Sequence, residues 1–277
     1  DDHVTCRPTR TLARHCWSDG AQLDLFADLE QSVAAVAAFS GARDAEAYRA
    51  FAMRAQGIYA TLKDSFIRAS RPNLFQLSRR IGLSRLGELM RLSPYSTLAG
   101  ALAQSFRDPR LRQLFARYAT YCGSSPYAAP ATLMLVAHVE REGVWLIEGG
   151  MQRLAEGLAA MGERFGATFL YQRRAARILV EGGRACGVEL DTGEHLAADA
   201  VIMNGDVMAL GAGLLGPDVT GAVSMPPPKT RFLSAVTWSM QGKAQGFPLL
   251  RHNVFFSDAY RAEFDDILIH GRAPRAP

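Results

Sequence analysis

Glycine spacing is the first feature of this chain that could serve chemistry. Residues 211–216 read Gly-Ala-Gly-Leu-Leu-Gly, the GxGxxG spacing of loops that hold the pyrophosphate of a dinucleotide. Such a loop must leave a strand and open a helix, because the first backbone amides of the helix face the phosphate. Here Pro217 and Asp218 follow, and no amphipathic helix begins. The context therefore argues against a phosphate site at this motif.

A second glycine pair and a polar turn stand in better positions. Residues 148–150, Glu-Gly-Gly, lie between an apolar run and a helical pattern, where glycines either approach a ligand or form a tight turn. Asn204, Gly205 and Asp206 follow the apolar run 200–203. Because ligands of α/β sheets gather at the carboxyl ends of strands, these three residues are candidate cofactor contacts. The alternative is that they cap the following helix.

Residues suited to metal or hydrolytic chemistry are scattered. The histidines and cysteines form no HExxH or CxxC spacing, and no GxSxG element occurs. We therefore expect no metal site, and free thiols suit a reducing cytoplasm. Asp265 and Asp266 follow Phe264 in a segment that reads as a loop, where paired carboxylates are expected to be solvated.

Composition limits the function classes. The chain has 277 residues, 48% hydrophobic content and a formal net charge of +4, which predicts a sizeable core and argues against nucleic-acid binding. No run reaches the roughly 18 apolar residues that span a bilayer. The first residues lack an initiating Met and a signal-peptide pattern, and the last residues read as a loop. We expect an internal part of a longer protein.

The elements that position the candidate residues follow from apolar periodicity. Residues 143–206 read as strand, helix, strand, hairpin and strand. The helix follows Gly150 and ends at Gly166, and the strands are predicted at 144–147, 168–171, 176–180, 186–190 and 200–203. The last strand is predicted to be buried on both faces. This pattern is typical of an α/β cofactor domain.

The flanking segments predict a different, mixed architecture. They contain a hairpin of 4–13 with 22–26, two helices within 28–63, one or two helices within 95–120 and a helix over 131–139. The pair Asp108-Pro109 predicts a helix start. Strands are predicted over 232–240 and from residue 254. Residues 66–92 are basic and amphipathic, which suits a membrane face or the entrance for an apolar substrate, or else an ordinary helix pair.

Several ordered motifs resemble the phytoene desaturase family of flavin-dependent carotenoid desaturases. The segment 143–161, GVWLIEGGMQRLAEGLAAM, is similar to that family's Gly-Val-Trp-x-x-x-Gly-Gly-Met-x-x-Leu element. Residues 106–131, with Gly-Ser-Ser-Pro at 123–126, resemble the helix and loop that precede it, and residues 173–206 resemble strands of the FAD domain. The flanking segments resemble the branch that acts on hydroxylated or methoxylated carotenoids.

The resemblance implies an enzyme that removes hydrogens from an acyclic carotenoid, adding a conjugated double bond near a hydroxylated or methoxylated end. FAD would accept a hydride, and a quinone or oxygen would reoxidise it. An apolar substrate implies peripheral association with the inner or photosynthetic membrane. The family's opening GxGxxG loop and closing glycine-rich segment are both missing from this sequence, so FAD binding by these residues alone should be weak.

The resemblance also suggests an organisation and a set of site residues. The fold class is α/β, mixed: a partial FAD-binding Rossmann-like domain at 141–220, interleaved with a mixed helical and β substrate domain at 1–140 and 221–277. By position, Arg174 and Ala175 join Asn204, Gly205 and Asp206 as predicted FAD contacts. Aromatic surface suits a polyene, so the predicted substrate contacts are four aromatic residues, each of which could instead be plain core: Tyr118, Tyr121, Tyr127 and Trp238. No catalytic residue can be placed.

Two further functions fit the residues less well. One is a non-catalytic module in which the α/β piece is a scaffold and the arginine-rich helices bind lipid or a partner. The other is an amine-oxidase-type flavoprotein, which shares the domain plan but oxidises amines.

Overall fold

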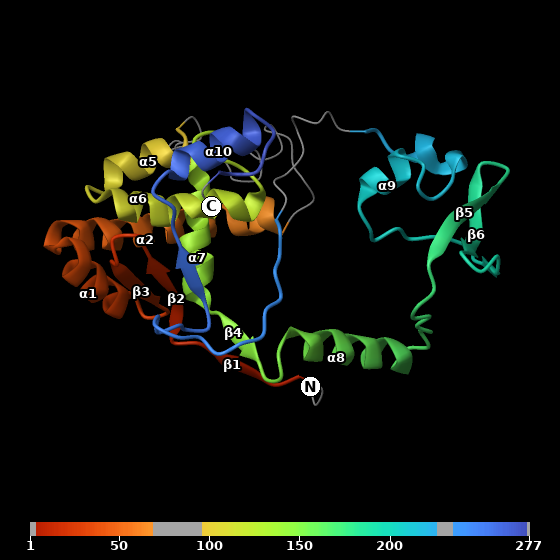
Figure 1. The fold of residues 1–277 in the computed structure, drawn as a ribbon, viewed down its shortest axis with the longest axis horizontal. Coiled ribbons are helices and arrows are strands. Elements are labelled where there is room, and N and C mark those ends of the chain that lie inside the picture. The colour runs from red at the N-terminus through yellow and green to blue at the C-terminus, as the bar shows by residue number, and fades with distance from the viewer. Residues whose placement is uncertain (1–3, 69–95, 226–234, 276–277) are drawn as a thin grey trace. The chain divides into compact units, whose positions relative to one another are not determined.

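The computed structural model describes residues 4–68, 96–225 and 235–275. The chain divides into two compact units, which are labelled by element in Figure 1. One, here called the helical unit, comprises Thr5–Gly150 and Phe232–Pro277. The other, the inserted unit, comprises Asp1–Val4 and Met151–Arg231. The predicted mixed α/β class is confirmed.

A three-stranded sheet organises one side of the helical unit, in the order β3 (Gln22–Phe26), β2 (Thr11–Cys16) and β8 (Asn253–Phe255). β2 and β3 form an antiparallel hairpin whose turn uses Gly20 at φ 83°. The predicted second strand, 22–26, is confirmed, but its partner is 11–16 and not 4–13. β8 pairs parallel with β2, His15 lying opposite Val254. β1 (Cys6–Pro8) instead pairs antiparallel with β4 (Trp145–Ile147). Because β8 pairs with β2, residues from opposite ends of the sequence share the three-stranded sheet.

The two helices predicted after the hairpin are confirmed as α1 (Leu29–Ser40) and α2 (Ala42–Leu62), with a π-helical turn, η1 (Lys63–Ile67), after α2. Asp28 caps α1 by accepting a hydrogen bond from the Gln31 amide at 2.8 Å. Gly41 separates the helices at φ 91°, a left-handed conformation that glycine adopts without a Cβ clash. The basic amphipathic segment 66–92 lies mostly outside the described residues.

The remaining helices of this unit within the described residues are short. They are α5 (Leu98–Ser105), α6 (Pro109–Ala116), η3 (Arg117–Cys122), η4 (Ala131–Met134), α7 (Leu135–Glu142) and α10 (Tyr260–Leu268). The helix start predicted at Asp108-Pro109 is confirmed: the Asp108 carboxylate accepts from the Arg110 amide, and proline occupies the first turn. None of the helices in the described segments is long and apolar enough to cross a bilayer.

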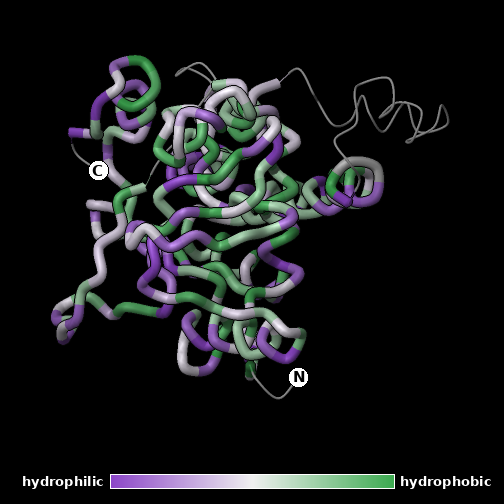
Figure 2. Tube along the Cα trace, turned by 90° about the vertical axis from the view of Figure 1, so that its right-hand side faces the viewer, coloured by the Kyte–Doolittle hydropathy of each residue, from purple (hydrophilic) through white to green (hydrophobic). Residues whose placement is uncertain are grey.

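Aromatic rings fill the core between α2, α6 and η3. Phe115 is fully buried and lies 4.7 Å from Phe51, 5.2 Å from Phe106 and 5.6 Å from Tyr48, measured between ring centroids. Figure 2 shows the underlying pattern, hydrophobic residues recurring between hydrophilic ones along the helices. Burial of such large rings is the main stabilising contribution, about 1.5–3 kcal/mol for each large apolar side chain.

The inserted unit contains one longer helix and a small antiparallel sheet. α8 (Met151–Arg164) precedes β5 (Ala175–Glu181), β6 (Arg184–Leu190) and β7 (His195–Ala197), which pair in sequence order. A short helix, α9 (Val207–Gly211), and a 3₁₀ turn, η5 (Pro217–Ala222), follow. The helix predicted after Gly150 and the hairpin at 181–183 are confirmed.

Three predicted strands are wrong. Residues 168–171 and 200–203 form no strand, and Ile202, predicted to be buried, is 92% exposed. The described part of 232–240 forms no strand either. A strand requires a hydrogen-bonded neighbour, and among the described residues none of these segments has one. The apolar composition of these segments indicated a local preference for strand, but the described residues supply no strand with which they pair.

Candidate functional site

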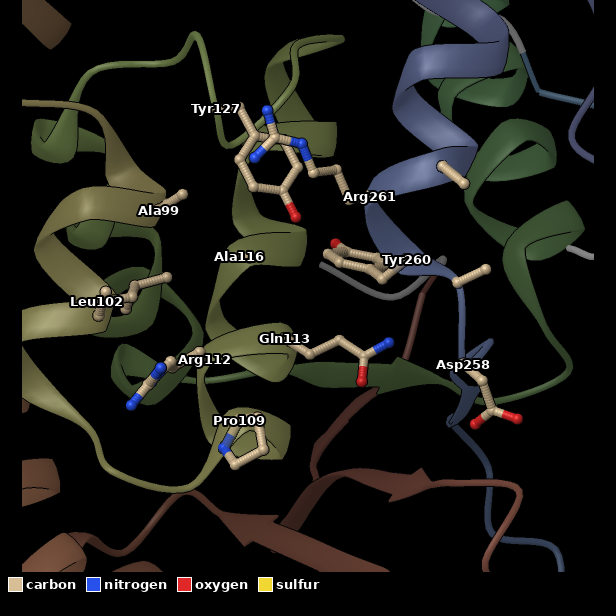
Figure 3. Close-up of a pocket in the computed structure, with 13 residues that line it drawn as sticks. Ala99, Leu102, Pro109, Arg112, Gln113, Ala116, Tyr127, Asp258, Tyr260 and Arg261 are labelled. Carbon is tan, nitrogen blue, oxygen red and sulfur yellow. The ribbon is translucent and has the colours of Figure 1, made fainter.

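A pocket of about 470 Å³ opens in the helical unit between α5, α6 and α10 (Figure 3). That volume falls within the roughly 300–1,000 Å³ of small-molecule sites. Small and apolar side chains from α5 and α6 form one side, and the start of α10 forms the other. The lining residues are Ala99, Leu102, Ala103, Pro109, Arg112, Gln113, Ala116, Tyr127, Asp258, Ala259, Tyr260, Arg261 and Ala262.

Tyr127 supplies a free polar group inside this pocket. Its hydroxyl points toward the middle of the lining residues, on the side of Tyr260 (Figure 3). The hydroxyl makes no hydrogen bond with the residues that the structure describes. The Arg261 guanidinium lies 4.7 Å from the centre of the Tyr127 ring, and the edge-on Phe264 ring lies 6.1 Å away. These contacts hold the ring and leave its oxygen available.

The amide and guanidinium groups of the pocket are already engaged. Gln113 accepts from the Trp17 indole at 2.9 Å and donates to the Ser257 carbonyl at 2.8 Å. Arg112 donates to the Phe106 carbonyl at 2.8 Å. Gln113 and Arg112 therefore hold the pocket walls in place, because either side chain would have to break an internal hydrogen bond in order to bind a ligand.

Tyr260 is the second tyrosine of the pocket. Its ring packs edge-on against Phe264 at 5.2 Å and Phe256 at 6.1 Å. Its hydroxyl oxygen is buried and has no hydrogen-bond partner among the described residues. Burial raises the pKa of this hydroxyl above its usual range, so the group stays a neutral donor. An unpaired buried hydroxyl is uncommon, because leaving it unpaired costs free energy.

A separate polar cluster joins η3 to α7. Arg117 donates to Glu140 at 2.9 Å and to the Tyr121 hydroxyl at 2.8 Å. Glu140 in turn accepts from the Tyr118 hydroxyl at 2.7 Å and from Tyr121 at 3.0 Å. Burial and the neighbouring Glu140 carboxylate raise the pKa of Tyr118 well above its usual range. Every member of this cluster makes hydrogen bonds within it, which is typical of a cluster that holds two helices together.

The four predicted substrate residues fall in three places. Tyr127 lines the pocket, whereas Tyr118, 1% exposed, and Tyr121, 60% exposed, belong to the Arg117–Glu140 cluster. Trp238 is 79% exposed and does not line this pocket. Their roles as substrate contacts stay predictions.

Sequence reasoning missed Tyr260 and Arg261, which the fold brings to the pocket from α10. The segment reads as a loop by composition, yet Asp265 and Asp266 lie on that helix. The expectation of solvated carboxylates is wrong for Asp266, which is buried and accepts from the Arg272 guanidinium at 2.9 Å. That hydrogen bond lowers the pKa of Asp266. The apolar spacing of Phe264 and Leu268 was the available signal for a helix.

The predicted cofactor residues lie in the inserted unit. Arg174 and Ala175 are exposed at the start of β5, where the Arg174 carbonyl accepts from the Asp191 amide at 2.9 Å. Asn204, Gly205 and Asp206 are also exposed. The Asp206 carboxylate caps α9 by accepting from the Met208 amide at 2.9 Å, which was the alternative considered for this turn.

The glycine motif at 211–216 does not form a phosphate cradle. The space a Cβ would occupy at Gly211 is taken by the Met225 side chain, and at Gly216 the Arg177 side chain lies 2.7 Å from that position. The motif begins at the last residue of the five-residue helix α9 and packs against β5, where the Ile178 amide donates to the Leu215 carbonyl. The described residues therefore do not fit the pyrophosphate of FAD at this motif.

Within 4–68, 96–225 and 235–275, no trio of histidine, cysteine or carboxylate side chains is close enough to hold an ion.

Comparison with known proteins gives a consistent result. The model of the family described as flavin containing amine oxidoreductase matches residues 2–242. A hydroxyneurosporene desaturase of Rubrivivax gelatinosus is 46% identical over 99% of this chain and 53% of its own length. That of Cereibacter sphaeroides is 47% identical over 96% and 54%. A lycopene-forming phytoene desaturase of a Paracoccus species is 30% identical over 95% and 52%.

The chain thus spans about half the length of the curated relatives it matches. The resemblance to carotenoid desaturases, drawn from the motifs between residues 106 and 206, is confirmed, and so is a flavin as the family's cofactor. The family match extends over both the helical and the inserted unit. The chain belongs to the family of flavin-containing amine oxidoreductases.

Proposed function

We propose that this chain forms part of an FAD-dependent desaturase that introduces a conjugated double bond into a hydroxylated or methoxylated acyclic carotenoid. The activity is that of a 1-hydroxycarotenoid 3,4-desaturase, also described as methoxyneurosporene dehydrogenase. The observation that carries the proposal is the 46% identity to a hydroxyneurosporene desaturase over 99% of this chain. The amine-oxidising alternative is less favoured, since the relatives described above are carotenoid desaturases.

The pocket of the helical unit supports an apolar substrate. Its walls include Ala99, Leu102 and Ala116, and two tyrosine rings face them. A polyene gains free energy by burying apolar surface against such walls, at about 25 cal/mol for each Å². Because the substrate dissolves in lipid, we infer that the protein works at the surface of the inner or photosynthetic membrane.

The cofactor contacts belong to the same proposal. Arg174 and Ala175, together with Asn204, Gly205 and Asp206, remain our candidates for FAD contacts. Bound FAD would supply the redox chemistry, with a quinone or oxygen as the final electron acceptor. A non-catalytic role as a lipid- or partner-binding module is the second candidate, and turnover separates the two.

The test is desaturation by the full-length gene product. Hydroxyneurosporene in liposomes is incubated with the protein, FAD and either a quinone or oxygen, and pigments are separated by chromatography. An added conjugated double bond shifts absorption to longer wavelength. We expect product only when FAD is supplied, and the absence of any FAD-dependent gain in conjugation would overturn the proposal.

A further inference from the structure

We propose that the pocket between α5, α6 and α10 receives the oxygenated end of the carotenoid and that the Tyr127 hydroxyl hydrogen-bonds to its oxygen. This inference rests on the function proposed above and adds a residue that determines specificity. It concerns recognition of one substrate end, and no step of the oxidation is assigned to Tyr127.

Size indicates that only part of a carotenoid enters. The pocket of about 470 Å³ suits a ligand of drug-like dimensions, whereas a carotenoid is a much longer rod. The alanine, leucine and proline side chains that α5 and α6 contribute suit the methyl groups at a terminal carbon, while Arg112 and Gln113 of α6 are held by their own hydrogen bonds. A terminus is therefore the part of the substrate that matches the pocket.

Polarity indicates which terminus enters. A plain hydrocarbon end offers Tyr127 no hydrogen bond, so its hydroxyl would be desolvated without a partner. A hydroxyl or methoxy oxygen accepts a hydrogen bond from the same donor. Sites that donate to a substrate oxygen reject analogues that lack it, because the buried donor is then left unpaired.

The surroundings of Tyr127 prepare it for this role. Arg261 lies over one face of the ring and Phe264 packs edge-on, so few orientations remain for the hydroxyl. Burial raises the pKa of Tyr127, which keeps the hydroxyl protonated and able to donate. The hydroxyl of Tyr260, unpaired among the described residues, lies on the same side and adds a second donor without a partner.

The experiment compares two substrates in the FAD-loaded, full-length gene product. kcat/KM is measured for hydroxyneurosporene and for neurosporene, which lacks the oxygen. For Tyr127→Phe we expect kcat/KM to fall for hydroxyneurosporene and to rise for neurosporene, which no longer leaves a donor unpaired. The preference for the hydroxylated substrate should fall about fivefold in total, the usual strength of one hydrogen bond. Methoxyneurosporene should lose as much as hydroxyneurosporene, because an ether oxygen also accepts.

Two further variants make the outcome decisive. Tyr59→Phe removes a hydroxyl from a half-buried tyrosine of the same unit that does not line the pocket, and should leave the preference unchanged. Ala99→Phe fills the pocket and should lower kcat/KM for both substrates while bound flavin is retained. An unchanged preference in Tyr127→Phe overturns this inference alone. If the wild-type protein desaturates neither substrate, the proposed function itself fails.

Discussion

At the scale of single residues, the ion pair between Arg117 and Glu140 is important for stability because it is largely buried. The side chains are 13% and 17% exposed. Separating a largely buried pair by removing one partner leaves a charge with neither water nor a counter-ion. The two tyrosine hydroxyls that bond to Glu140 would lose their acceptor as well.

We expect Glu140→Leu to lower the free energy of unfolding by about 3 kcal/mol. The double variant Arg117→Leu with Glu140→Leu should lose less than the two single losses added together, since it leaves no unpaired charge. Chemical denaturation of the full-length gene product measures all three. Strict additivity would show that the pair is not coupled.

His15 predicts a dependence of stability on pH. The side chain is fully buried, and its Nδ1 donates to the Leu23 carbonyl at 3.2 Å. Burial, with the nearby Arg117 charge, lowers the pKa of His15 from 6.5 to about 3. The unfolded chain therefore binds a proton that the folded protein does not bind between these two values.

The stabilisation from neutral His15 is complete above about pH 6.5 and is lost as the pH falls toward about 3. We expect the free energy of unfolding to decline in this window by up to about 1.4 kcal/mol per pH unit from this group. His15→Leu should reduce that slope. Denaturant titrations at several pH values check it, and equal slopes would contradict the assignment.

Helices and strands differed in how far the sequence could predict them. Asp108 marked a helix start, because a carboxylate that caps an amide acts within three residues, and Asp28 caps α1 in the same way. The segments 168–171 and 200–203 failed as strands, since a strand depends on a neighbour that local sequence does not specify. Tyr127 could be proposed for the substrate site from its residue type alone. Its contact with α10 could not be predicted, because local sequence does not specify which distant segments pack together.

Two glycines of the α1–α2 pair predict opposite effects. At Gly57, inside α2, an added Cβ meets no atom within 4 Å, so Gly57→Ala should stabilise by about 0.5–1 kcal/mol through helix propensity. At Gly41 there is equal space but φ is 91°, so Gly41→Ala should destabilise by about 1 kcal/mol or more. Thermal unfolding of both variants checks the signs, and a stabilised Gly41→Ala would refute the backbone argument.

The whole molecule shows an uneven distribution of burial. The core lies in the helical unit, whereas α8 of the inserted unit buries none of its residues within the described structure. Leu158 and Met161 on α8 are 54% and 45% exposed, and Phe165 beyond it is 87% exposed. Over its described residues, the inserted unit has no strand, glycine-rich loop and helix in the order that binds a pyrophosphate.

A polypeptide limited to residues 1–277 should therefore bind FAD weakly. After incubation with excess FAD and gel filtration, we expect little flavin absorbance to accompany the protein. The full-length gene product, treated identically, is the control. Stoichiometric flavin on residues 1–277 would show that the inserted unit binds the cofactor without a glycine-loop cradle.

The parallel pairing of β2 with β8 has a consequence for synthesis in the cell. β3 leaves the ribosome directly after β2, whereas β8 emerges only after the whole inserted unit. At ribosomal speed that interval lasts on the order of tens of seconds. Throughout it, one edge of β2 carries unpaired amides and carbonyls, which can pair with other nascent chains. The helical unit thus completes its sheet last, and a chaperone that shields this edge would raise the yield of folded protein.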